Sequence, residues 1–180
     1  MLRIFYLLIF LMISCEQYNL PKQKGYLAHQ FNKPEYELIN TDCNFSFMTN
    51  KKSEIKHISN CNIIISYAKL KAEIFISNLK INKNIKLLIQ DFNTKVQENS
   101  ITINKISVSE FNDFENNKFG LSYSFEGDSP SNIQFHVTDS VTNFLVGSLY
   151  FRTKPNFDSL VPSIYYIEND IKKIIETLRW

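Results

Sequence analysis

The segment KFGLSYSFEGDSPSNIQFHVTDSVTNFLVGSLYFR, residues 118–152, decides the fold of this chain. Apolar side chains alternate with polar ones over 119–125 and again over 133–137, which is the period of a β-strand. A turn cluster at 127–130 separates these two strands, and a third strand is expected over 143–152. Links this short join only antiparallel strands, because parallel pairing needs a crossover of about a dozen residues or more. The segment therefore predicts an antiparallel meander.

Two amphipathic helices are predicted, one before this meander and one after it. Residues 84–98 carry apolar side chains at helical spacing, which indicates a helix that packs on a sheet. The second helix is expected to have Ser159 as its N-cap and Pro162 in its first turn. Its apolar face comprises Val161, Ile164, Ile167, Ile171, Ile174, Ile175 and Leu178. Each helix thus has one face for burial.

The first half of the chain adds further strands. Phe45 and Phe47 alternate with polar neighbours and predict a short strand after Cys43. The other segments expected to be extended are 62–67 and 71–77, joined by a loop at 68–70, and 101–111. The order of elements predicts an α+β fold in which amphipathic helices cover an antiparallel β-sheet meander. It resembles a PsbP/Mog1-like sandwich, an analogy of fold that implies no function.

The N-terminus is typical of a lipoprotein signal peptide. Arg3, an apolar run over 4–13 and the small residue Ser14 precede Cys15, the expected lipidation site. A spanning helix needs about 20 apolar residues, so this run favours export. The alternative is an ordinary cleavage site, because Met12 stands where a lipidation motif prefers leucine. The expected parts are a signal peptide (1–14), a lipidated N-terminus with a polar tether (15–24) and a single α+β domain (25–180).

Composition restricts the partners and the cysteine chemistry. The formal net charge is +2 and both signs are mixed along the chain, whereas nucleic-acid binding needs a clustered basic face. We therefore expect no nucleic-acid partner. Cys43 and Cys61 lie 18 residues apart and are expected to form a disulfide in an exported chain. The alternative is two buried thiols, and their spacing does not favour a metal site.

Candidate catalytic residues are few. His136 and Asp139 at the end of the second meander strand could transfer a proton, which would allow a hydrolase. The alternative is that both are polar surface residues of a half-exposed strand. Glycine occurs only four times, and no phosphate-binding glycine loop or metalloprotease motif is present. We expect no enzyme activity, no metal and no cofactor.

A segment rich in aromatic and basic residues is a candidate for partner binding. Aromatic and arginine side chains are the types that dominate protein interfaces. The candidate residues are Tyr150, Arg152, Lys154, Phe157 and Trp180. The alternative is that the aromatic members belong to the core.

The chain resembles the gliding-motility lipoprotein GldD family of Bacteroidota over nearly the whole mature sequence. The resemblance rests on several blocks in the same order: PKQKGY (21–26), CNFSF (43–47), Cys61, TDS (138–140), GSLYF (147–151), KPNFDS (154–159) and LRW (178–180). Asn44 and Asn62 stand where family members often have proline and an aromatic residue.

The resemblance implies an accessory envelope lipoprotein, without assigned catalytic residues, that is required for gliding motility and linked to type IX secretion. Its partners would be other proteins of that apparatus and the membrane, through acyl chains such as palmitate on Cys15, and its domain would be periplasmic. A different hypothesis is a lipid-anchored small-molecule or glycan-binding module, which needs a concave pocket lined by Tyr and Phe.

Overall fold

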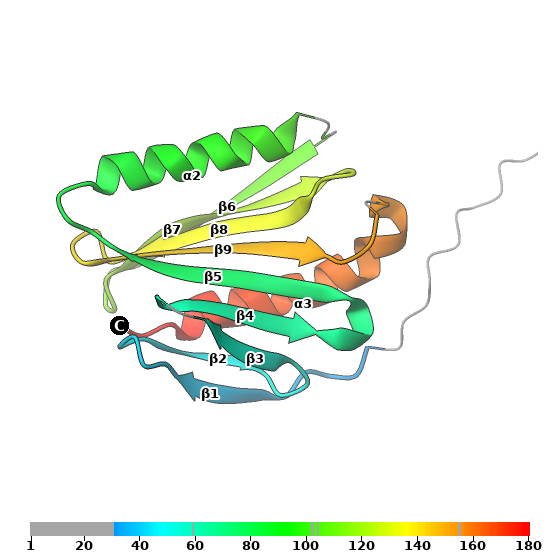
Figure 1. The fold of residues 1–180 in the computed structure, drawn as a ribbon, viewed down its shortest axis with the longest axis horizontal. Helices are drawn as coiled ribbons and strands as arrows, with labels where there is room; N and C mark the ends of the chain where they lie inside the picture. The colour runs from blue at the N-terminus through cyan, green and yellow to red at the C-terminus, as the bar shows by residue number, and fades with distance from the viewer. Residues whose placement is uncertain (1–30, 59, 102, 104, 155) are drawn as a thin grey trace, which may run out of the picture.

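The computed structural model describes residues 31–58, 60–101, 103, 105–154 and 156–180. Within these residues, nine strands form two sheets and two α-helices pack on them (Figure 1). The strands are β1 (Tyr36–Asn40), β2 (Ser46–Asn50), β3 (Glu54–Ile58), β4 (Asn62–Tyr67), β5 (Ala72–Lys80), β6 (Lys105–Asp113), β7 (Lys118–Glu126), β8 (Ser131–Thr138) and β9 (Asn143–Phe151). The helices are α2 (Ile85–Ser100), α3 (Phe157–Thr177) and the short 3-10 helix η1 (Ala68–Leu70).

The predicted α+β class and antiparallel meander are confirmed. The large sheet has the order β3-β4-β5-β9-β8-β7-β6, and all its neighbours are antiparallel. Strand β9 pairs with β5, so the meander continues directly into the hairpin of β4 and β5. The turn of that hairpin is η1, where the loop was expected. Strands β1 and β3 were not predicted, because neither carries the regular alternation that marks a half-buried strand.

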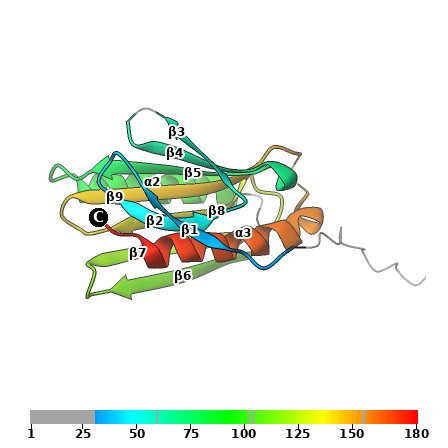
Figure 2. The same cartoon turned by 90° about the horizontal axis from the view of Figure 1, so that it is seen from below.

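The large sheet is covered on both faces at β8. Helix α2 lies on one face, while α3 and the small β1–β2 sheet lie on the other (Figures 1 and 2). All eight residues of β8 are buried as a result. Ile133, Phe135 and Val137 belong to the core under α3, and the residues between them face α2. The expectation that β8 is half-exposed is therefore wrong.

Helix α3 anchors the larger core. Its buried isoleucines lie on the stripe predicted from the sequence, and each contributes roughly 1.5–3 kcal/mol relative to exposure. Its N-cap is Asn156 and not Ser159, because the Asn156 side chain accepts a hydrogen bond from the Ser159 backbone N–H. The helix starts further upstream than predicted, and Pro162 lies inside it. Helix α2 buries only Phe92 and Val96, in a separate small cluster.

Candidate functional site

The predicted lipid anchor lies outside the described residues. Cys15, the signal peptide 1–14 and the tether 15–24 all precede Phe31, the first described residue. No helix of the described part is both long and apolar enough to cross a membrane. Attachment of the domain through Cys15 therefore stays a prediction.

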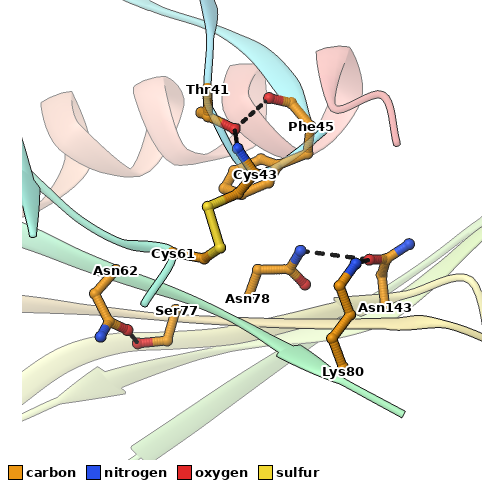
Figure 3. Close-up of a disulfide and its surroundings, with 9 residues drawn as sticks. All are labelled: Thr41, Cys43, Phe45, Cys61, Asn62, Ser77, Asn78, Lys80 and Asn143. Atoms are coloured by element: carbon orange, nitrogen blue, oxygen red, sulfur yellow. Dashed lines mark hydrogen bonds between the residues drawn. A yellow bond between two sulfur atoms is a disulfide. The ribbon is translucent and has the colours of Figure 1, made fainter. Parts of the chain in front are cut away.

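A disulfide joins the two sheets. Cys43 precedes β2 and Cys61 lies in the turn between β3 and β4, with their Cα atoms 5.7 Å apart (Figure 3). The Thr41 hydroxyl fixes the first of these segments, since it donates to the Phe45 carbonyl at 2.7 Å and accepts from the Cys43 N–H at 3.3 Å. The bond ties the β1–β2 sheet to the edge of the large sheet.

One predicted partner-binding residue, Tyr150, lies on a partly uncovered strip of the large sheet, and a second, Arg152, pairs with Glu73 of that strip. We call the strip the open face and define it by Glu73, Phe75, Ser77, Val146, Ser148 and Tyr150. These residues come from β5 and β9 and lie opposite one another in register. Helix α2 covers His136 and Phe144 further along the sheet, and Val146 packs against the same cluster, whereas Phe75 and Tyr150 stay exposed. The tertiary arrangement thus exposes side chains that a fully covered sheet would bury.

An aromatic pair and an ion pair shape the open face. Phe75 and Tyr150 are 40% and 37% exposed and make an edge contact, with ring centroids 5.5 Å apart. The exposed Arg152 pairs with the buried carboxylate of Glu73, and this hydrogen bond and charge raise the pKa of the guanidinium. A groove of about 540 Å³ runs along the strip and is bordered by Lys95 of α2. The strip therefore combines apolar rings with a charged rim.

The other three predicted residues do not join this surface. Lys154 is exposed in the loop after β9. Phe157 is the first residue of α3 and packs against the main core, as does Trp180. The C-terminus and the end of β9 lie at opposite ends of the domain in Figure 1. Trp180 therefore cannot extend the surface around Tyr150.

His136 and Asp139 do not form a proton-transfer pair. His136 is buried between Phe144, on which it stacks at 5.2 Å, and Phe92, and burial lowers the pKa of its imidazole to about 4. Burial opposes ionisation of Asp139, but hydrogen bonds from the backbone N–H groups of residues 141–143 outweigh it and lower the pKa of its carboxyl. Both the hydrolase and the surface interpretation of His136 are wrong. The described residues contain no group of three or more His, Cys, Asp or Glu side chains placed to hold a metal ion.

A second concave site was not predicted from the sequence. We call it the tyrosine pocket, a cavity of about 440 Å³. Its lining residues are Phe31, Asn32, Lys52, Glu54, Tyr67, Ala68, Lys69, Leu70 and Tyr166. The rings of Phe31 and Tyr166 stack with their centroids 4.7 Å apart, so one wall is an aromatic platform.

A fully buried carboxylate holds the wall of this pocket in place. Asp170 accepts hydrogen bonds from the Tyr36 hydroxyl at 2.8 Å, the Asn50 amide at 2.9 Å and the Tyr67 hydroxyl at 3.0 Å. The same Asn50 amide donates to the Tyr166 hydroxyl. Burial and Asp170 raise the pKa of Tyr67, and both raise that of Tyr36 as well. The sequence feature that could have indicated this network is Asp170, an acidic residue on the otherwise apolar stripe of α3.

Comparison with known proteins identifies one family. The family model described as gliding motility lipoprotein GldD matches residues 16–180. A search of curated proteins finds no match.

Proposed function

The chain belongs to the gliding motility lipoprotein GldD family, and we propose that it is a non-catalytic envelope component that supports gliding motility and type IX secretion. The observation that carries this proposal is the family match, which covers the chain from residue 16 to its end. Proteins of this family are accessory components of gliding motility, and the family is not a known enzyme family. Their lipoprotein character implies membrane association.

The anchor in this proposal is Cys15. Acyl chains on this residue would hold the domain at a membrane, since several chains together give stable attachment. The tether 15–24 would then let a periplasmic domain lie up to roughly 30 Å from the anchor when extended. Cys15→Ala should abolish acyl labelling and release the protein from membranes. Unchanged membrane association of this variant would contradict the assignment.

The open face is the surface through which the domain would contact proteins of the gliding and secretion apparatus. Exposed aromatic rings beside an arginine are typical of the residues that dominate protein interfaces. Phe75 and Tyr150 supply the rings, and Arg152 supplies a charge at the rim. Because Glu73 holds Arg152, the guanidinium is positioned before a partner arrives.

Genetic complementation tests the function and the surface together. The gene is expressed in a gliding bacterium that lacks its own GldD, and colony spreading and adhesin secretion are scored. We expect the wild-type gene to restore both, and Tyr150→Ala combined with Phe75→Ala to restore neither at equal protein level. Tyr165→Ala is the matched control, because this tyrosine of α3 is 57% exposed and lies outside the open face. Equal rescue by both variants would exclude the open face as the docking surface.

The tyrosine pocket favours a second candidate function, a small-molecule or glycan-binding module. Its volume and its mixture of aromatic and polar lining match what ligand pockets require. A glycan array probed with the full-length protein in detergent tests this candidate, and Tyr166→Ala should remove any binding. Binding that survives the loss of this ring would place the ligand elsewhere.

A further inference from the structure

The two edges of the large sheet differ in how they are protected. An exposed edge strand is a template for another strand, and proteins usually shorten it or place charges on it. Edge strand β3 has five residues and carries Glu54 and Lys56. Edge strand β6 has nine residues, and an uncharged segment 106–109 separates Lys105 from Glu110. Within the described residues, β6 has a strand neighbour on one side only.

Strand β6 is also exposed over its first six residues, of which Ser107 borders a hollow that α3 lines on its other side. Residues 105–110 are all exposed, and the apolar Ile106 and Val108 are 41% and 55% exposed. Ser107 and Ser109 alternate with them and point to the other face.

The charges at the two ends of β6 are complementary to each other. Lys105 lies opposite Glu126 of β7, with its Nζ 2.7 Å from the carboxylate. Asp113 lies opposite Lys118 of β7, with 3.2 Å between the charged atoms. Lys105 and Asp113 are an even number of residues apart, so their side chains share one face. The strand is thus positive at its start and negative at its end.

We propose that β6 pairs antiparallel with β6 of a second copy of this chain, with Ser109 opposite Ser109. Lys105 of one copy then lies opposite Asp113 of the other, at both ends of the pair. Each end becomes a row of four alternating charges across two copies: Glu126, Lys105, then Asp113 and Lys118. All nine residues of β6 overlap, and the two large sheets become one continuous sheet. A parallel pairing would instead place lysine opposite lysine, which is unfavourable.

A competing register is centred on Ser107. It would place Ile106 opposite Val108, but only residues 105–109 would overlap within β6, and Asp113 would lie outside the pair. The two registers predict different distances. With Ser109 at the centre, the two Ser109 Cα atoms lie about 5 Å apart. The two Ser107 residues are then offset by four positions, or roughly 14 Å along the strands.

Charged substitutions at the centre of the pair test the dimer. Full-length protein in detergent is studied by analytical ultracentrifugation over a range of concentrations, and we expect a reversible dimer. Ser109→Lys or Ser109→Glu should raise the dimer dissociation constant about fivefold or more, because like charges then face each other. An equimolar mixture of the two variants should restore association. Lys56→Glu on β3 is the matched control and should leave association unchanged.

Disulfide trapping tests the register. In a Cys15→Ala background, with Cys43 bonded to Cys61, an introduced cysteine is the one free thiol of the chain. Ser109→Cys should give a covalent dimer on mild oxidation, because disulfides need Cα atoms within about 7 Å. Ser107→Cys should remain monomeric under the same conditions.

Three results would overturn the proposal. The first is a monomeric wild-type protein at every concentration. The second is a dimer that neither Ser109→Lys nor Ser109→Glu weakens. The third is a covalent dimer through Ser107→Cys but not through Ser109→Cys, which would replace the proposed register with the competing one.

Discussion

Removal of the Asp170 carboxylate should strongly destabilise the domain. Asp170→Ala deletes the acceptor that the Tyr36, Asn50 and Tyr67 side chains share. Tyr67 and Asn50 are buried and cannot turn to water, and each buried donor left without an acceptor costs about 1–3 kcal/mol. Tyr36 is half-buried and can bond to solvent, and the Asn50 amide keeps Tyr166 as a partner.

The expected loss of unfolding free energy is about 2–5 kcal/mol, out of roughly 5–15 kcal/mol for a domain. Urea unfolding followed by circular dichroism and tyrosine fluorescence measures it, with the disulfide kept oxidised. The matched control is Asn169→Ala, at the preceding position of α3, where the side chain is exposed and the change should stay within about 0.5 kcal/mol.

A loss below about 1 kcal/mol for Asp170→Ala, with an unchanged denaturant slope, would refute this reasoning. It would mean that the three donors find other acceptors or water when the carboxylate is gone. A loss in the expected range should also widen or disorder the tyrosine pocket, because Tyr67 and Tyr166 line it.

Three further predictions concern stability. His136 has a pKa of about 4 when folded and 6.5 when unfolded, so the unfolded state binds its proton first as the pH falls. The unfolding free energy should therefore decrease between pH 6.5 and 4, by up to about 3 kcal/mol, and His136→Leu should remove this decrease in unfolding curves recorded at each pH. Replacing both Cys43 and Cys61 by alanine should cost about 3 kcal/mol through the entropy of the 18-residue loop, and an unchanged melting temperature would contradict this. Gly147→Ala should cost at least about 1–3 kcal/mol, because a Cβ there would lie 2.1 Å from the Phe135 ring, whereas Ser148→Ala on the opposite face should melt close to the wild type.

The strands of the meander could be predicted because the alternation of apolar and polar residues is visible within each short segment of the sequence. Alternation over 119–125 and 133–137 placed β7 and β8. The helical spacing of the isoleucines placed α3. The start of α3 was misplaced because Asn156 and Ser159 are both good N-caps, and the choice between them depends on the first turn in three dimensions.

The candidate sites were harder to predict. Tyr150 and Arg152 were identified by residue type, but their neighbours Phe75 and Glu73 lie about 75 residues earlier and meet them only through the pairing of β5 with β9. The aromatic residues Phe157 and Trp180 were grouped with them by residue type, and residue type does not distinguish a core position from a surface position.

The sequence by itself determined the family, the capacity for one disulfide and most of the local elements, though not β1 and β3, because these features depend on residue types and their spacing along the chain. The tertiary structure decided which faces of the sheet are covered. A polar residue such as His136 looks exposed until a second helix is seen to lie on it. The structure also decided the hydrogen-bond network behind the tyrosine pocket, where β1, β2, β4 and α3 bring together five side chains spread over residues 36–170. Such sites depend on contacts between distant segments, and the hydrophobic periodicity of one segment does not predict these contacts.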